Sequence, residues 1–161
     1  MSRLDLFIDR MVSQRACLDA AIIQTATMTG PVFELGLGNG RTFHHLRERI
    51  SGRDIFVFER AVASHPDSTP EDDQLILGDV NETLVQALGR FGATASLIHA
   101  DLGGHSRDKN DVFARRISPL VEPLLARGGM MVASDRMYFE TLTEMPLPEN
   151  AVEGRCFIYQ R

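Results

Sequence analysis

The chain has 161 residues, of which 43% are hydrophobic and 24% are charged, and its formal net charge at pH 7 is −5. This length and composition predict a single globular domain, residues 1–161, with a hydrophobic core and little room for a second domain. The negative net charge argues against a nucleic-acid partner bound chiefly through its phosphates, because that mode of binding needs a basic surface.

Cysteine usage and hydropathy indicate the compartment. Cys17 and Cys156 are far apart and form no C-x-x-C pair, and the sequence contains neither an apolar signal segment nor an apolar run long enough to span a bilayer. These features predict a cytoplasmic protein with no membrane partner. Both thiols are then reduced, and we expect them to behave as small buried hydrophobic side chains.

The first predicted element is an amphipathic helix, or a pair of helices, over 4–27, where apolar residues recur mostly at helical spacing. We interpret residues 1–28 as an N-terminal helical cap on a core over 31–161. The apolar face of this cap could pack on the chain's own sheet or on a second copy of the chain. We expect a homo-oligomer.

The most informative segment is PVFELGLGNGRT, residues 31–42. It predicts a short apolar strand over 31–35, a loop with glycines at every second position, and a helix over 41–50 that starts directly after the loop. Glycines allow a sharp turn and let backbone N–H groups and the positive end of a helix approach a ligand closely. The segment therefore predicts a nucleotide-cofactor site.

The glycine spacing helps to identify the cofactor. The dinucleotide fingerprint G-x-G-x-x-G would need a third glycine where this sequence has Arg41. Here an acid, Glu34, precedes three alternating glycines instead. A loop of this kind without any ligand remains an alternative.

After the glycine loop, strand and helix patterns alternate, which predicts a doubly wound parallel sheet with helices on both faces. An exposed connection over 64–73, rich in proline and acids, replaces or shortens one crossover helix. A helix over 109–127 is expected to break or kink at Ser118-Pro119 and to end at Gly128-Gly129. The other predicted elements are strands over 55–58, 75–77, 95–100 and 130–134 and a helix over 81–91.

Acidic residues stand at the carboxyl ends of the predicted strands, where the ligand of a doubly wound sheet lies. Glu59 lies about 20 positions beyond Gly40, the offset at which an acid reaches ribose hydroxyls in such folds. The five strand-end acids are Glu34, Glu59, Asp79, Asp101 and Asp135.

Taken in order, E-x-G-x-G-x-G over 34–40, Glu59, Asp79 and the strand over 95–101 resemble motifs I to IV of the class I S-adenosylmethionine-dependent methyltransferases. The resemblance covers about residues 31–135 and suggests a short, single-domain, bacterial-type member. It implies a Rossmann-like fold with a seven-stranded sheet, whose last strands form a reversed hairpin. Residues 155–159 would supply the final antiparallel strand of a truncated hairpin.

The resemblance also implies S-adenosylmethionine as the cofactor. In the family, the glycine loop holds the aminocarboxypropyl end and the ribose, and a carboxylate placed like Asp79 takes the exocyclic amine of adenine. Asp79 could equally be the N-cap of the next helix. The implied cofactor-binding residues are Glu34, Leu35, Gly36, Gly38, Asn39, Gly40, Glu59, Arg60, Gly78, Asp79 and Val80.

Methyl transfer is an in-line displacement, which a pocket base assists when the nucleophile must lose a proton. The candidate catalytic residues are His99, Asp101 and His105, with the imidazoles best matched to neutral pH. His99 could instead be a hydrogen-bonded histidine packed at a strand end, and His105 a plain loop histidine.

A second resemblance, to catechol-type metal-dependent O-methyltransferases, concerns Asp101 and Asp135. Arg136 stands at the asparagine position of that metal site, and a cation there would displace a metal ion, so no metal is predicted. An arginine aimed at the pocket suits a carboxylate or phosphate. Together with Arg107 and Arg115, it predicts a small-molecule acceptor with an acidic group.

Two other function classes stay open. A non-catalytic, regulatory protein that binds S-adenosylmethionine is favoured by the short chain and by the lack of an Asn-Pro-Pro-Tyr motif after the strand over 95–100. An NAD-dependent oxidoreductase is disfavoured by Arg41 and by the absence of a substrate domain.

Overall fold

The computed structural model of the chain describes residues 1–104 and 106–161. Its strands are β1 (Val32–Leu35), β2 (Ile55–Glu59), β3 (Leu75–Leu77), β4 (Ala95–Ala100), β5 (Leu125–Ala133), β6 (Thr143–Glu144) and β7 (Phe157–Gln160). They form one seven-stranded sheet in the order β3-β2-β1-β4-β5-β7-β6. The pairs among β1 to β5 are parallel, whereas β7 runs antiparallel to both β5 and β6. The predicted α/β class, mostly parallel sheet and short C-terminal hairpin are confirmed.

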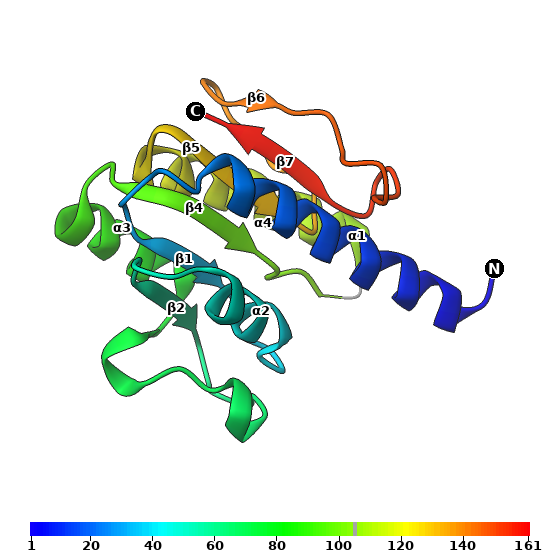
Figure 1. The fold of residues 1–161 in the computed structure, drawn as a ribbon, viewed down its shortest axis with the longest axis horizontal. Coiled ribbons are helices and arrows are strands. Elements are labelled where there is room, and N and C mark those ends of the chain that lie inside the picture. The colour runs from blue at the N-terminus through cyan, green and yellow to red at the C-terminus, as the bar shows by residue number, and fades with distance from the viewer. Residues whose placement is uncertain (105) are drawn as a thin grey trace.

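A layer of helices covers each face of the sheet (Figure 1). The helices α1 (Arg3–Gln24) and α2 (Arg41–Arg49) lie on one face, and α3 (Val80–Phe91) and α4 (Arg107–Val121) lie on the other. Successive side chains of a strand point to opposite faces, so Val32 packs in the α1 and α2 layer and Phe33 in the α3 and α4 layer. The central strands β1 and β4 are therefore buried along their whole length.

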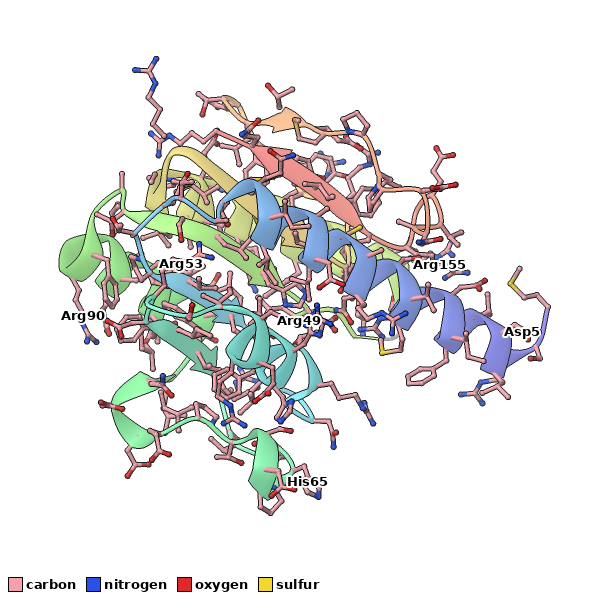
Figure 2. The ribbon with its side chains drawn as sticks, in the orientation of Figure 1. Asp5, Arg49, Arg53, His65, Arg90 and Arg155 are labelled. Atoms are coloured by element: carbon pink, nitrogen blue, oxygen red, sulfur yellow. The ribbon has the colours of Figure 1, made fainter. Side chains whose placement is uncertain are left out.

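The N-terminal segment is one continuous helix that serves two purposes. Its second half contributes Cys17, Leu18 and Ala21 to the core beneath the sheet face. Its first half starts at a capping box between Ser2 and Asp5 and projects beyond the sheet, as the position of Asp5 in Figure 2 shows. The apolar face of α1 thus packs on the chain's own sheet along the second half only.

The helix that was predicted to break or kink at Ser118-Pro119 does not break there. α4 continues through Pro119 and ends at Val121, and a 3-10 turn, η3 (Glu122–Leu124), follows it. Proline removes one backbone hydrogen bond, and here the loss falls in the last turn of the helix. The Ser118 hydroxyl supports this end, because it donates to the Ala114 carbonyl at 2.6 Å and accepts from the Tyr138 N–H at 2.9 Å.

The prediction that Gly128 and Gly129 end a helix was wrong. Both glycines lie inside β5, which already begins at Leu125. Gly128 has a φ of +80°, and the pairing of β4 with β5 shifts register at this end of the strands. A Cβ on Gly129 would come within 2.9 Å of the carbonyl oxygen of Ala95. The glycines therefore serve a β-bulge, which a pattern typical of a helix end does not distinguish from a C-cap.

Two further expectations, about the 64–73 connection and about the two cysteines, agree with the structure. The connection over 64–73 contains no α-helix, only the 3-10 turns η1 (Pro66–Ser68) and η2 (Asp72–Gln74). Cys17 and Cys156 are free and buried. Within the described part of the chain, no helix combines the length and the apolar character needed to cross a membrane.

Candidate functional site

Three of the cavities at the carboxyl ends of the parallel strands share residues or lie next to each other. The first cavity has a volume of about 260 Å³ and lies over the ends of β2 and β3. The second, of about 120 Å³, lies between α1 and the glycine loop. The third, of about 170 Å³, lies beyond the ends of β4 and β5 and shares Arg10 and Asp101 with the second.

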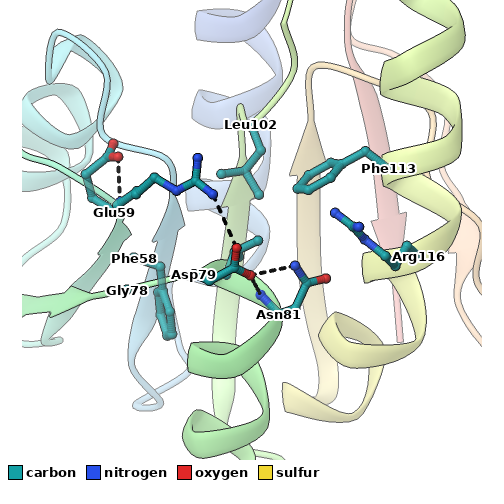
Figure 3. A pocket seen from close by; sticks show the side chains of 10 residues that line it. Phe58, Glu59, Gly78, Asp79, Asn81, Leu102, Phe113 and Arg116 are labelled. Carbon is teal, nitrogen blue, oxygen red and sulfur yellow. Dashed lines mark hydrogen bonds and ion pairs between the residues drawn. The ribbon is translucent and has the colours of Figure 1, made fainter.

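The first cavity has apolar walls and a polar edge (Figure 3). Phe58, Leu102 and Phe113 supply apolar surface, and Asp79 and Asn81 supply hydrogen-bonding groups at the start of α3. Such a mixture suits a flat heterocycle, which needs contact on its faces and hydrogen bonds at its edge. Five of the predicted cofactor residues line this cavity: Glu59, Arg60, Gly78, Asp79 and Val80.

Asp79 is the N-cap of α3 and also borders the first cavity, so both interpretations of this residue apply. One carboxylate oxygen accepts from the Asn81 backbone N–H at 2.9 Å and from its side-chain amide at 2.6 Å. The other oxygen lies 3.4 Å from Nη2 of Arg60. These bonds, above all those from Asn81, hold the pKa of Asp79 below its ordinary value, so it is a carboxylate at neutral pH.

Glu59 joins the first cavity to the glycine loop. Its carboxylate accepts from four backbone N–H groups, those of Leu37 at 2.8 Å and Gly38 at 3.2 Å in the loop and those of Arg60 and Ala61 just after β2. Burial alone would raise the pKa of Glu59, but these four bonds lower it below its ordinary value. The acid thus shapes the loop as well as facing the cavity.

The glycine loop has the conformation that its sequence requires. Gly36, Gly38 and Gly40 all have positive φ angles, of +88°, +50° and +86°. A Cβ on Gly36 would lie 2.6 Å from the carbonyl oxygen of Asp101, so the loop can lie against the end of β4 only because this residue is glycine. Gly36, Gly38 and Asn39 line the second cavity, opposite Phe7 and Arg10 of α1.

Glu34 and His99 form a buried ion pair and do not face any open space. They are partners in the register between β1 and β4, both side chains have no exposed surface, and the Glu34 carboxylate lies 2.7 Å from Nδ1 of His99. Glu34 also accepts from the Thr42 hydroxyl at the start of α2, and Nε2 of His99 lies 3.2 Å from the Gln14 amide. A histidine enclosed in this way cannot contact an acceptor, so this geometry does not fit the base predicted at position 99.

The pKa of His99 follows from this enclosure. Burial alone would lower the pKa of the imidazole, but the Glu34 carboxylate, and behind it Asp101, raise it above its ordinary value. The two carboxyl groups near the ring thus favour its protonated form. The ring connects Glu34 of β1 with Gln14 of α1.

Of the two catalytic candidates that the structure describes, Asp101 is the one that reaches the open crevice. Its carboxylate lies 2.6 and 2.7 Å from Nη2 of Arg10 and 3.1 Å from the amide of Gln14. Burial would raise the pKa of this carboxyl, but Arg10 and then His99 outweigh that effect and hold it below its ordinary value. Asp101 is consequently ionised at neutral pH but is a weak proton acceptor.

Sequence reasoning missed Arg10 and Gln14, although a signal was present. The two residues are four apart and share one face of α1, where Gln14 is buried among otherwise small or apolar side chains. A buried polar side chain in an amphipathic helix indicates a partner. The sequence could not indicate which strand end would supply it.

We expect Arg10→Gln to raise the pKa of Asp101 toward its ordinary value, because the nearest opposite charge is removed. An acid with a depressed pKa stabilises the fold above its ordinary pKa, and the effect is lost as the pH falls through the folded-state pKa. The variant should therefore lose less of its stability on acidification than the wild type does. Carboxylate titration by NMR measures the first effect, and thermal unfolding across acidic pH measures the second.

Arg15→Gln is the matched control for this prediction, because Arg15 is exposed on another face of the same helix. It should leave the titration of Asp101 unchanged. An Asp101 titration that is identical in wild type and Arg10→Gln would contradict the ion pair.

The third cavity is built from both ends of the chain. Arg10 comes from α1, Arg107 and Asn110 from the start of α4, Asp135 from the end of β5, and Arg155 from the segment before β7. Figure 2 shows Arg155 beside the middle of α1. A backbone hydrogen bond from Val152 to the Ser13 hydroxyl at 2.9 Å ties this last segment to α1.

Two of the three arginines predicted to attract an acidic acceptor point elsewhere. Arg136 pairs with Glu144 at 2.7 Å and lies over the ring of Phe157. Arg115 pairs with Asp111 and lies over Tyr138. The prediction that Arg136 is aimed at the pocket was wrong, since the hairpin β6–β7 offered it a partner that the sequence pattern could not show.

Arg136 does not lie beside the two acids of the metal-site resemblance, Asp101 and Asp135, because it pairs with Glu144. The cation beside Asp101 is Arg10, and Asp135 is bound by the Asn110 amide at 3.1 and 3.2 Å. Over 1–104 and 106–161, no group of three His, Cys, Asp or Glu side chains is arranged to hold a metal ion. His105, the third catalytic candidate, lies outside the described residues.

Comparisons with known proteins agree on one family. A family model described as S-adenosyl-L-methionine methyltransferase matches residues 1–161. The crystal structure of an S-adenosyl-L-methionine methyl transferase from Silicibacter pomeroyi is 74% identical, with a TM-score of 0.98 over 100% of this chain and 99% of that one. Among curated proteins, no significant match is found.

More distant structures share the fold. A 1,6-didemethyltoxoflavin-N1-methyltransferase from Burkholderia thailandensis, with bound 1,6-didemethyltoxoflavin and S-adenosylhomocysteine, is 13% identical, with a TM-score of 0.57 over 98% of this chain and 81% of that one. An RNA methyltransferase from Salinibacter ruber, in complex with S-adenosyl-L-homocysteine, is 16% identical, with a TM-score of 0.51 over 89% and 87% of the two chains.

Proposed function

The chain belongs to the S-adenosyl-L-methionine methyltransferase family and uses S-adenosylmethionine as its cofactor, and from this premise we propose that it methylates a small-molecule acceptor held in the third cavity. The observation that carries the proposal is the order of the three cavities along the strand ends. The first and second cavities lie on either side of the hydrogen bonds between Glu59 and the glycine loop. The second cavity shares Asp101 with the third cavity.

The residues of the first cavity fit the adenosine part of the cofactor. Phe58, Leu102 and Phe113 offer apolar contact to a flat ring, and the Asp79 carboxylate can accept from an exocyclic amine. Glu59, partly exposed, lies where ribose hydroxyls can reach it. A ribose would share or replace some of the N–H groups that Glu59 now accepts from, since a carboxylate offers about four acceptor positions.

The second cavity fits the charged amino-acid end of the cofactor. Arg41 stands at the start of α2, where the helix dipole favours a carboxylate, and Gln14 and Asn39 offer amide groups. Gly36 and Gly38 leave the loop without side chains on this side. Leu35 is buried, and Gly40 packs against Ser68, so we assign both to loop shape and not to ligand contact.

When bound, S-adenosylmethionine would supply an electrophilic methyl group on a positively charged sulfur, suited to in-line transfer to a lone pair of the acceptor with the carbon–sulfur pair returning to sulfur. Asp101 lies where the cofactor and acceptor cavities meet, and its carboxylate can orient the acceptor and accept its hydrogen bond. Its low pKa suits orientation better than proton removal. His105 remains a proposed base, and His99 a positioning residue.

The proposal also covers the class of acceptor, the cellular compartment and the oligomeric state. The net charge of −5 supports a small-molecule acceptor over a nucleic acid. Two free, buried cysteines are consistent with the reducing cytoplasm, which we propose as the compartment. Exposed Leu4, Phe7 and Ile8 on the projecting half of α1 support a homo-oligomer, which light scattering on purified protein would test.

We expect Asp79→Asn to weaken S-adenosylhomocysteine binding by about tenfold, because the amide turns one acceptor of the adenine amine into a competing donor. Calorimetric titration with S-adenosylmethionine, S-adenosylhomocysteine and NAD measures this. The wild type should bind the two sulfur compounds at micromolar level and not NAD. Asp73 is an exposed acid of the 64–73 connection, and the control variant Asp73→Asn should bind S-adenosylhomocysteine like the wild type. If the wild type bound NAD and neither sulfur compound, the assignment of the cavities would be refuted.

A further inference from the structure

Among the residues that the structure describes, no apolar side chain lines the third cavity. The described lining residues are charged, polar or glycine: Arg10, Asp101, Gly103, Gly104, Arg107, Asn110, Ser134, Asp135, Gly154 and Arg155. Ligand sites in proteins are usually lined mainly by apolar and aromatic groups, with a few polar groups that orient the ligand. This cavity reverses that composition, so an apolar or aromatic acceptor would find no matching surface in it.

Only some of the arginines that line the third cavity form ion pairs within the described structure. Arg10 is neutralised by Asp101 at 2.6 Å. Arg107 and Arg155, in contrast, have no carboxylate within 4.0 Å among the residues that the structure describes. The cavity therefore presents two guanidinium groups that are available to an anion, and guanidinium binds carboxylate or phosphate with two parallel hydrogen bonds.

Asp135 faces the same cavity as an acid without a cationic partner in the described structure. Its two oxygens accept from the Asn110 amide at 3.2 and 3.1 Å, and Asn110 in turn accepts from the Gly104 N–H at 2.9 Å. A Cβ on Gly103 would lie 2.1 Å from Asp135 Oδ2. The loop after β4 is thus shaped to hold this carboxylate in place, with acceptor capacity left for a ligand donor.

The size of the cavity limits what can be enclosed. Its volume of about 170 Å³ corresponds to about six water molecules at the liquid volume of roughly 30 Å³ each. One compact anionic group and one donor group fill such a space. The volume thus limits the part of the acceptor that enters this cavity to small polar groups.

We propose that the methyl acceptor is a small hydrophilic molecule that carries a compact anion, a carboxylate or a phosphate, together with an amine or hydroxyl. Arg107 and Arg155 bind the anion, and Asp135 accepts a hydrogen bond from the amine or hydroxyl. The inference rests on the proposed function and adds the chemical class of its acceptor. Of the three arginines predicted from the sequence, it keeps Arg107, drops Arg115 and Arg136, and adds Arg155.

The test uses the full chain saturated with S-adenosylhomocysteine and small probes whose binding is followed by saturation-transfer NMR. Glycine, serine and glycolate carry both groups of the proposed class, and phosphoethanolamine, which has a phosphate and an amine but no carboxylate, separates a phosphate from a carboxylate. Glycinamide, serinamide and glycolamide lack the carboxylate, and catechol and indole represent aromatic acceptors. We expect the anionic probes to bind and the amides and aromatics not to bind.

Two variants locate the site. Arg107→Gln/Arg155→Gln should weaken the anionic probes by at least about tenfold, because two charge-assisted contacts are lost. Arg127→Gln, at an exposed arginine near the start of β5, is the control and should not change the binding of any probe. Both variants should bind S-adenosylhomocysteine like the wild type.

Equal binding of acids and amides, preferential binding of aromatics, or an unaffected double variant would overturn the inference. So would the absence of any probe signal in protein that does bind S-adenosylhomocysteine. Failure to bind S-adenosylhomocysteine itself would overturn the proposed cofactor site, and the acceptor class would fall with it.

Discussion

Replacement of His99 by alanine is expected to lower the free energy of unfolding by about 3–5 kcal/mol, the usual cost of removing one partner of a buried ion pair. His99 and Glu34 have no exposed surface, and their side chains are 2.7 Å apart across β1 and β4. Without the imidazole, the Glu34 carboxylate stays buried, and among the described residues only the Thr42 hydroxyl remains as its partner. Urea unfolding at neutral pH measures the loss.

The control is a double-mutant cycle with Glu34→Ala. Each single variant leaves one buried partner unpaired, whereas the double variant leaves none, so its loss should be smaller than the sum of the two single losses. Additive losses would contradict a direct coupling between the two side chains.

The same pair predicts a pH dependence with a definite sign. Since the pKa of His99 is raised in the folded protein, its stabilising contribution is complete below the ordinary histidine pKa of about 6.5 and is lost as the pH rises through the folded-state pKa. The wild type should therefore lose stability on the alkaline side of neutrality. His99→Ala should lack that loss, and a wild-type stability that stays constant there would count against a charged His99.

Glu59→Ala is expected to weaken S-adenosylhomocysteine binding by about 10–100-fold, since it removes a charged acceptor from the proposed ribose site. It also frees the loop N–H groups of Leu37 and Gly38, which Glu59 now holds at 2.8 and 3.2 Å. A loop without this anchor must be ordered at the cost of binding energy. Calorimetric titration of both proteins measures the difference in affinity.

Glu48→Ala is the matched control, because Glu48 is an exposed acid on α2 and its loss changes the net charge equally. The control should bind S-adenosylhomocysteine like the wild type. Wild-type affinity in Glu59→Ala would show that Glu59 only shapes the loop. Thermal unfolding of each variant separates that structural contribution from ligand contact.

The parts of the fold that the sequence predicted correctly are those with local causes. The turn from β1 into α2 needs glycines with positive φ, and the start of α3 needs a cap such as Asp79. The errors at Pro119 and Gly128 have the opposite origin. A proline in a last helical turn and a glycine in a β-bulge depend on what packs beside them, here Tyr138 and the end of β4.

The site residues also divide into those that could be predicted from local sequence and those that depend on tertiary packing. Glu59 and Asp79 could be predicted because each follows a strand at a characteristic offset from the loop. Arg10 and Arg155 could not, because they are 145 positions apart, and only the packing of α1 against the last segment brings both to the end of β4. The burial of His99 likewise depends on α1, whose Gln14 covers the ring.

The sequence by itself determined the strand and helix alternation, the family and the cofactor, because backbone geometry at a glycine loop and at strand ends depends on neighbouring residues. Tertiary structure alone decided which charges meet. Arg10 became the partner of Asp101, Arg136 the partner of Glu144, and His99 the buried partner of Glu34. Electrostatic interactions depend on distance and burial, and neither is a property of sequence position.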